Sequence, residues 1–346
     1  MTNNLRTIKR HLLYAFSAAL FGVVCAAFLV YVAGLLPGYL LHAATAQTSY
    51  GTDSHQIATK PLSPAQEQAR ENLDEDKLST PVPSVYSRPH TVTASQYLVI
   101  DLTEPDSPAA TTSIMSPFVL AERTILQKDV GRAVPIASLT KLVTAVVAQN
   151  ILDQNTSIEI TQKIINTEGD SADFRVGEKF NVPELMYPLL MVSSNDAGEA
   201  LARSDPDGRA DFIRTMNEWV QSIGAYHTYF ADPTGLSPDN VSNAGDLAII
   251  MRWVYQNRPG LIAITETKVK LFRVHTWTNP TRLLNLSSYI GGKNGYIPES
   301  GETAVSLFNV GYKLFAVVVL GSSDRDQDIL ELMHEATGVA YISYEN

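Results

Sequence analysis

Apolar and polar positions divide this chain into stretches of different character. Residues 12–36 contain no charged side chain, residues 47–92 are polar and interrupted by prolines, and from residue 93 onward apolar runs alternate with polar breaks. The uncharged run is long enough to cross a bilayer as a helix. The pattern therefore predicts an N-terminus at 1–11, a transmembrane segment at 12–36, a flexible linker at 37–92 and a folded domain at 93–346.

Within the predicted domain, the spacing of apolar positions changes from strand-like to helical and back. Short apolar runs bounded by turn-forming residues predict strands, and longer runs with a period near 3.6 predict helices. We expect strands at 96–103, within 116–129, and at 289–297, 303–309 and 313–321, and helices at 138–152, 182–193, 195–203, 207–224, 243–256 and 324–338. Strands at both ends and helices in the middle predict an α+β domain with an antiparallel sheet packed against helices.

The charges that flank the uncharged run predict where the domain lies. Arg6, Lys9 and Arg10 precede the run, which by the positive-inside rule places the N-terminus in the cytoplasm and the domain outside. A cleaved signal peptide is the alternative, because Ala44-Thr45-Ala46 has the form of a cleavage site. The run is longer than a usual signal peptide's apolar region, which favours a retained anchor. Either interpretation makes the domain extracytoplasmic.

Composition excludes several classes of protein. The net charge of -10 argues against a nucleic-acid partner. Cys25 is the only cysteine, so the predicted domain has no disulfide, thiol nucleophile or cysteine-ligated metal. The seven histidines show no metal-ligand spacing. We therefore expect neither a metal site nor a cofactor.

Ser138 and Lys141 form the first candidate for chemistry. They lie three residues apart at the start of a predicted helix, which places hydroxyl and amine on one face. A neutral lysine there can accept the serine proton, and the positive helix end can hold an oxyanion. Such a pair occurs by chance about once in a chain of this length. The absence of other charges from Leu142 to Leu152 favours a functional lysine.

Two further polar sites are candidates for function, but each has an ordinary structural explanation when taken alone. Residues 193–195, Ser-Ser-Asn, separate two predicted helices, and ordinary helix capping explains them. Lys293 lies in a predicted strand, and a solvated lysine on an edge strand is common. However, Gly291, Gly292 and Gly295 weaken that strand, and such glycines are usual where a ligand or another backbone comes close.

The three candidates occur in a recognisable order: Ser-x-x-Lys at 138–141, Ser-x-Asn at 193–195 and Lys-x-Gly at 293–295. This order is the motif set of penicillin-recognising serine enzymes. The longer stretches PIASLTKLVTA, SSNDAGEALA and FADPTGLSPDN agree with it. The chain from 93 to 338 therefore resembles the D-alanyl-D-alanine carboxypeptidases among the low-molecular-mass penicillin-binding proteins. The resemblance implies a five-stranded antiparallel sheet packed with helices, the penicillin-binding-protein and β-lactamase-like transpeptidase fold.

The resemblance also implies a role for each matching residue. Ser138 would be the acylated nucleophile, Lys141 its general base and Ser193 a proton relay. Lys293 would attract the terminal carboxylate of the substrate, and as a second cation it would favour the neutral form of Lys141.

The remaining positions implied by the resemblance contact substrate. The expected substrate-binding residues are Asn195, Lys293, Asn294, Gly295 and Tyr296. Asn195 would bind the substrate backbone, and the Ser138 and Tyr296 amides would form the oxyanion hole. Asn294 departs from the family, which has threonine or serine there, and offers an amide donor in place of a hydroxyl.

The implied activity is a serine-type D-alanyl-D-alanine carboxypeptidase that trims terminal D-Ala from peptidoglycan stem peptides, with β-lactams as covalent inhibitors. A D,D-endopeptidase acting on cross-links is an alternative. A catalytically weakened wall-binding protein is another, because of Asn294. A class A β-lactamase is disfavoured, since no Glu-x-x-x-Asn follows the Ser-x-Asn motif. The sequence leaves the oligomeric state and the stem-peptide chemistry open.

Overall fold

The computed structural model describes residues 91–103, 123–169 and 172–338, all of which lie in one compact unit, Pro83–Asn346. Within these residues, five strands form one antiparallel sheet in the order β2-β1-β11-β10-β9. Its strands are β1 (Gln96–Asp101), β2 (Thr124–Lys128), β9 (Tyr289–Ile297), β10 (Gly301–Val310) and β11 (Lys313–Ser322). The predicted α+β class and antiparallel sheet are confirmed.

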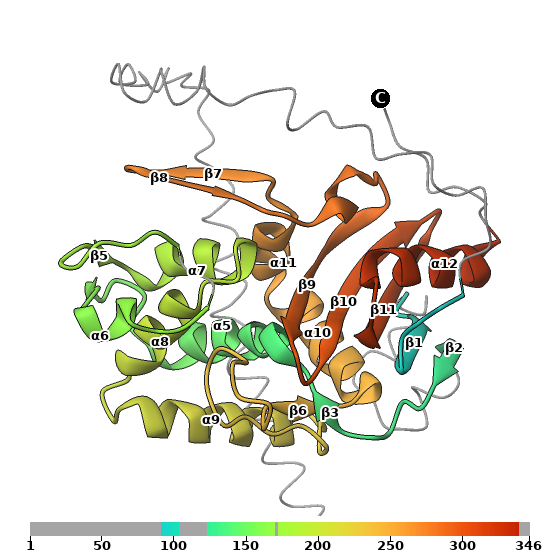
Figure 1. The fold of residues 1–346 in the computed structure, drawn as a ribbon, viewed down its shortest axis with the longest axis horizontal. Helices are drawn as coiled ribbons and strands as arrows, with labels where there is room; N and C mark the ends of the chain where they lie inside the picture. The colour runs from blue at the N-terminus through green and yellow to red at the C-terminus, as the bar shows by residue number, and fades with distance from the viewer. Residues whose placement is uncertain (1–90, 104–122, 170–171, 339–346) are drawn as a thin grey trace, which may run out of the picture. The chain divides into compact units, whose positions relative to one another are not determined.

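Helices cover both faces of this sheet (Figure 1). They are α5 (Thr140–Ile151), α6 (Gln162–Ile165), α7 (Val182–Met191), α8 (Asn195–Arg203), α9 (Arg209–Ser222), α10 (Ala244–Asn257), α11 (Pro259–Glu266) and α12 (Arg325–Thr337). On one face, α12 packs Ile329, Leu332 and Met333 against Val317 and its neighbours. The other face packs against α10 and, through a continuous core, the remaining helices. The central strand β11 is apolar from Leu314 to Leu320, where both its faces are buried.

Short strand pairs complete the fold and were not predicted from the sequence. They are β3 (Val134–Pro135) with β6 (Val241–Ser242), β4 (Ile158–Glu159) with β5 (Lys179–Phe180), and β7 (Val269–Phe272) with β8 (His275–Thr278). The β7–β8 hairpin turns at Arg273, whose φ of 54° is unusual for a residue other than glycine. Without a glycine or asparagine in the turn, the sequence carries no hairpin signal.

The predicted segments 1–11, 12–36 and most of 37–92 lie outside the described residues. None of the helices in the described ranges is both long and apolar enough to cross a bilayer. Part of the predicted strand within 116–129 is also outside them, and β2 occupies its C-terminal half.

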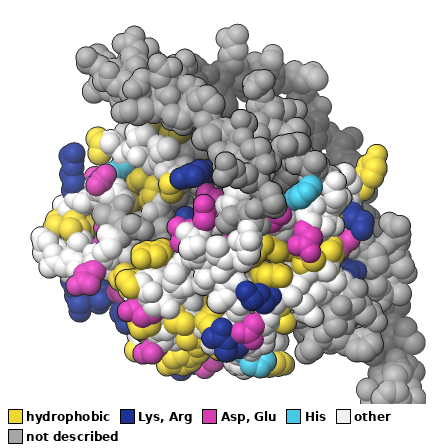
Figure 2. Space-filling model, turned by 45° about the vertical axis from the view of Figure 1, so that its right-hand side comes forward, with side chains coloured by type: hydrophobic (Ala, Val, Ile, Leu, Met, Phe, Trp, Pro, Cys, Tyr) yellow, Lys and Arg dark blue, Asp and Glu magenta, His cyan; other side chains and the backbone are white. Residues whose placement is uncertain are grey.

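The charges on the described surface are mixed in sign. On the face shown in Figure 2, Lys and Arg side chains alternate with Asp and Glu and form no large patch of one sign. Several are paired, such as Arg214 with Asp211 and Lys313 with Asp101.

Candidate active site

A cleft of about 600 Å³ runs along the exposed edge of the sheet, between β9 and the helices. Most of the predicted site residues line it: Ser138, Ser193, Asn195, Lys293, Asn294, Gly295 and Tyr296. They come from three separate segments of the chain, so the fold brings together residues as far apart in the sequence as 138 and 296. Lys141 is not part of the lining and is fully buried.

Ser138 and Lys141 form a close pair at the floor of the cleft. Ser138 lies in the 3₁₀ turn η2 (Ala137–Leu139), which leads directly into α5. The two atoms Lys141 Nζ and Ser138 Oγ are hydrogen-bonded at 2.7 Å. Lys141 Nζ also donates to the backbone oxygen of Thr234 at 2.6 Å. The lysine amine is therefore held beside the serine hydroxyl, within proton-transfer distance.

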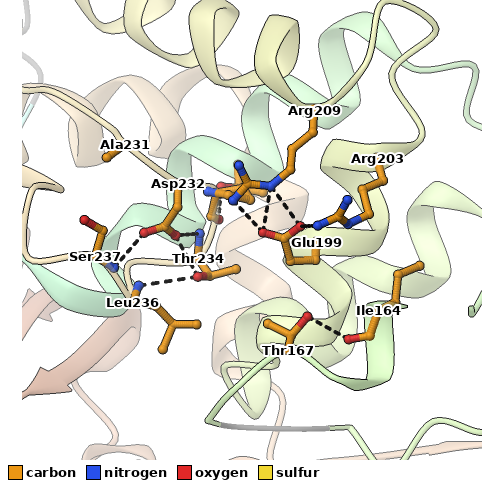
Figure 3. A network of polar contacts seen from close by, with 12 residues as sticks. Ile164, Thr167, Glu199, Arg203, Arg209, Ala231, Asp232, Thr234, Leu236 and Ser237 are labelled. Atoms are coloured by element: carbon orange, nitrogen blue, oxygen red, sulfur yellow. Dashed lines mark hydrogen bonds and ion pairs between the residues drawn. The ribbon is translucent and has the colours of Figure 1, made fainter. Parts of the chain in front are cut away.

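The turn that holds Lys141 is organised by one carboxylate, Asp232 (Figure 3). Asp232 Oδ1 accepts from the Thr234 amide at 2.6 Å, the Thr234 hydroxyl at 2.7 Å and the Gly235 amide at 2.8 Å. Asp232 Oδ2 accepts from the Ser237 amide at 2.7 Å. Through the Thr234 oxygen, this turn positions Lys141.

A second charged group packs near that turn. Glu199 of α8 is buried, with Arg209 Nη2 at 2.7 Å and Arg203 Nη2 at 2.9 Å from its carboxylate oxygens (Figure 3). The hydrogen bonds from Arg209 to Glu199 raise the pKa of Arg209 above its usual value. This group ties α8, which begins at the Ser-x-Asn motif, to α9.

Two glycines allow backbone segments to approach Ser138 closely. A methyl group on Gly235 would lie 1.9 Å from the Ala137 oxygen, and one on Gly295 would lie 2.8 Å from the Ser138 nitrogen. The absence of a side chain at both positions lets β9 and the 232–237 turn pack directly against η2. The predicted close approach of another backbone to the strand therefore occurs at Gly295, where it brings β9 next to the Ser138 amide.

Ser193 and Lys293 form the opposite wall of the cleft. Lys293 Nζ donates to Ser193 Oγ at 3.0 Å and to the backbone oxygen of Asn294 at 2.7 Å. Ser193 lies between α7 and α8 with a φ of 60°, a backbone conformation that is strained for serine. Strain of this kind concentrates at functional sites.

The two asparagines of the cleft have different surroundings. Asn195 is buried, and its Nδ2 donates to the Glu168 oxygen at 2.8 Å. Asn294 is half-buried on β9, and its Nδ2 donates to Thr281 Oγ1 at 3.3 Å. The sequence did not indicate Thr281, which precedes the short 3₁₀ turn η3 (Arg282–Asn285).

Arg325 is another cleft residue that the sequence did not indicate. It is the first residue of α12 and lines the cleft, with Nη1 at 3.7 Å from Glu302 Oε1. Its neighbour Asp326 is largely buried, and that burial raises the pKa of the Asp326 carboxyl. No local motif marks Arg325 or Thr281, because their positions depend on how α12 and the segment after β8 pack on β9.

The only carboxylate group in the described residues with metal-ligand spacing lies outside the cleft. One oxygen each of Asp205, Asp207 and Asp211 lies within 4.8 Å of the others. Asp211 is already paired with Arg214, and Asp205 caps its own turn by accepting from the Asp207 amide at 3.0 Å.

Comparison with known proteins identifies relatives of this chain. A family model described as D-alanyl-D-alanine carboxypeptidase matches residues 105–324, which is more than half of the chain. A D-alanyl-D-alanine endopeptidase of Escherichia coli (strain K12) is 31% identical over 54% of this chain and 63% of its own length. The D-alanyl-D-alanine carboxypeptidase DacF of Bacillus subtilis is 27% identical over 62% of this chain and 60% of its own length.

Solved structures show the same fold. The crystal structure of a D-alanyl-D-alanine carboxypeptidase from Mycobacterium tuberculosis matches with a TM-score of 0.62 at 24% identity. The match covers 74% of this chain and 96% of that one. Each of the two curated relatives named above is matched over less than two thirds of its own length.

Proposed function

Because this chain belongs to the D-alanyl-D-alanine carboxypeptidase family, we propose that it removes the terminal D-Ala from peptidoglycan stem peptides through an acyl-enzyme on Ser138. The observation that carries the proposal is the 2.7 Å contact between Lys141 Nζ and Ser138 Oγ in a cleft that Lys293 also lines. A nucleophile and a base at this distance are what acyl transfer requires.

The proposed chemistry follows from these positions. Neutral Lys141 accepts the proton of Ser138 while Ser138 Oγ attacks the carbonyl carbon of the penultimate D-Ala. The amides of Ser138 and Tyr296 stabilise the oxyanion. The carbon–nitrogen bond then breaks as the proton held by Lys141 passes through Ser193 to the leaving nitrogen, which returns Lys141 to its neutral form. The Ser193 hydroxyl lies 3.0 Å from Lys293 Nζ.

The second half of the reaction releases the shortened peptide. A water molecule attacks the ester carbon, Lys141 accepts a proton from that water, and the ester bond to Ser138 Oγ breaks. The serine oxygen regains a proton, which restores the starting state. β-Lactams present a reactive amide to the same serine, so they acylate it and act as covalent inhibitors.

We also propose that the domain works outside the cytoplasmic membrane, held by the segment 12–36. The basic residues before this uncharged run support that orientation. An extracytoplasmic location agrees with the proposed peptidoglycan substrate. A reporter enzyme that is active only outside the cytoplasm is expected to be active when fused after residue 92. Activity of a reporter that works only in the cytoplasm, fused at the same point, would contradict the orientation.

Labelling with a fluorescent penicillin tests the catalytic proposal. The wild type is expected to carry one covalent label, which Ser138→Ala abolishes and the exposed control Ser222→Ala retains. An unlabelled wild type would contradict the acyl-enzyme and favour the non-catalytic wall-binding alternative. A label that persists in Ser138→Ala would show that another residue is the nucleophile.

Hydrolysis assays separate the two peptidase alternatives. Release of D-Ala from a pentapeptide indicates the carboxypeptidase, and release of monomers from a cross-linked dimer indicates the endopeptidase. Since the relatives include proteins with either name, both substrates need to be measured in parallel, with Ser138→Ala as the blank.

A further inference from the structure

The end of the cleft beside Asn294 contains an acceptor atom without a partner. Asn294 Nδ2 donates to Thr281 Oγ1 at 3.3 Å. The other atom of the same amide, Asn294 Oδ1, is buried and has no hydrogen-bond partner within the described part of the chain. Leaving a buried acceptor unpaired is energetically unfavourable. Because Asn294 lines the cleft, an N–H group of a ligand is a suitable partner for this atom.

Thr281 is held firmly next to this amide. Its backbone nitrogen donates to Asn279 Oδ1 at 3.2 Å, and Asn279 Nδ2 donates to the Thr265 oxygen at 2.9 Å. Thr265 Oγ1 in turn accepts from the Gly292 amide of β9 at 3.0 Å. These contacts fix the segment after β8 against β9. Since Thr281 Oγ1 accepts from Asn294, the hydroxyl proton is available for a ligand oxygen.

Arg325, the arginine that lines this cleft, has acidic neighbours. Glu302 Oε1 and Asp326 Oδ1 each lie 3.7 Å from a nitrogen of Arg325. Glu302 Oε2 also accepts from the Arg325 amide at 2.9 Å. A cation that already has anionic neighbours attracts a further anion less strongly. This end of the cleft is therefore less selective for a free carboxylate than Lys293 alone would make it.

Together these contacts match the hydrogen-bonding pattern of a neutral amide. On the basis of the proposed function, we propose that Asn294 and Thr281 bind the carboxyl end of the leaving residue when it is a carboxamide or a further peptide bond. The ligand N–H donates to Asn294 Oδ1, and the ligand carbonyl accepts from the Thr281 hydroxyl. A carboxylate has acceptors only, so it leaves Asn294 Oδ1 unpaired. The substrate class thus extends to D-Ala-D-Xaa peptides with a blocked C-terminus.

Paired substrates test this specificity on the full-length chain. The probes are diacetyl-L-Lys-D-Ala-D-Ala and its C-terminal carboxamide, and the quantity compared is the ratio of kcat/KM for the amide to that for the acid. Asn294→Thr is expected to lower this ratio about tenfold or more, the effect of one lost hydrogen bond. Asn294→Asp is expected to raise it, because its carboxylate still accepts an N–H but repels the free acid.

Thr281→Val provides a second, independent arm. It removes the donor to the ligand carbonyl and is expected to lower kcat/KM for the amide. The matched control Thr276→Val, at an exposed position on β8, is expected to keep the wild-type ratio. Where Asn294→Thr does not fold, the ratio for Asn294→Asp decides the matter in the same way.

Two outcomes overturn the proposal and can be told apart. If the ratio is unchanged or raised in Asn294→Thr while benzylpenicillin still adds its mass to Ser138, the amide subsite is wrong and the proposed function stands. If the wild type neither forms that adduct nor hydrolyses either peptide, both the subsite and the proposed function are wrong.

Discussion

Gly295 has no room for a side chain beside the nucleophile. A methyl group there would lie 2.7 Å from Thr303 Oγ1 and 2.8 Å from the Ser138 nitrogen. β9 must therefore shift away from the nucleophile to admit any side chain. We expect Gly295→Ala to slow penicillin acylation about a hundredfold, since loss of one oxyanion donor has effects of that size. Stopped-flow acylation kinetics measure the effect.

The control for this variant is Gly131→Ala, since a methyl group on Gly131 would meet no atom within 4 Å. Acylation by Gly131→Ala should match the wild type. An acylation rate for Gly295→Ala within threefold of wild type would contradict the close approach of β9 to Ser138.

Asp326 predicts a pH-dependent change in stability. Burial raises its pKa above the ordinary value of 3.8. The Asp326 carboxyl therefore loses its proton at a lower pH in the unfolded chain than in the folded chain. As a result, the contribution of Asp326 to the stability of the folded state falls as pH rises from below 3.8 through the pKa of the folded state. Asp326→Asn cannot ionise, so we expect its Tm to exceed that of wild type at pH 7 and to approach it at pH 3.

Thermal unfolding at both pH values checks this sign. The exposed position Asp239→Asn serves as the control, with no expected pH-dependent difference. A Tm gain for Asp326→Asn that is larger at pH 3 than at pH 7 would contradict the direction of the shift.

At the scale of elements, the turn at 232–237 acts through Lys141. Its four donors depend on the Asp232 carboxylate, and its Thr234 oxygen accepts from Lys141 Nζ at 2.6 Å. We expect Asp232→Ala to slow acylation at least tenfold and to move the acylation pH profile, because the lysine loses its fixed partner. Asp232→Asn keeps one acceptor oxygen, so its acylation rate should lie between those of the wild type and Asp232→Ala.

A shift in the pH profile distinguishes this positioning role from a loss of folded protein. Asp239→Ala removes an exposed carboxylate from the same loop and should change neither the rate nor the profile. If Asp232→Ala lowers the amount of active protein but leaves the profile unchanged, the turn contributes stability alone.

Elements with strong local signals were predicted well. The strand predicted at 289–297 matches β9, and the helix predicted at 195–203 matches α8. The helix predicted at 138–152 divides into η2 and α5, because the close contacts of Gly235 and Gly295 fix η2 in a tighter turn. The β7–β8 hairpin and the helix α11 were missed, since their sequences carry neither turn signals nor a clear period.

The site residues also divide into those with a local sequence signal and those without one. Ser138, Lys141, Ser193 and Lys293 belong to sequence motifs, and the structure brings their side chains into hydrogen-bonded pairs. Thr281 and Arg325 lie in the cleft through tertiary packing alone, which leaves no local trace in the sequence. The surroundings of Asn294 likewise become visible only when Thr281 is placed beside it.

For the whole molecule, Asp328 joins the two ends of the described domain. Its buried carboxylate accepts from the Thr93 amide at 2.8 Å, the Ala94 amide at 2.9 Å and the Ser322 hydroxyl at 2.6 Å. Removing it leaves several buried donors unpaired, which costs about 3 kcal/mol. We expect Asp328→Ala to lower the Tm by about 6–12 °C, given about 2–4 °C per kcal/mol in a domain of this size.

Differential scanning calorimetry measures this loss. Glu335→Ala, an exposed change on the same helix, should stay within about 0.5 kcal/mol of wild type. A Tm for Asp328→Ala within 2 °C of wild type, which corresponds to less than about 1 kcal/mol, would contradict the importance of this junction.

The order of strands has a mechanical consequence. The first described strand, β1, lies near one edge of the sheet, and β9 forms the opposite edge (Figure 1). The cleft lies along β9. A pull on residue 93 while a substrate is held against β9 is transmitted sideways from β1 through β11 and β10. Each of these junctions is an antiparallel ladder whose hydrogen bonds lie along the direction of the pull. A domain loaded along this path would therefore open by separating strands one pair at a time.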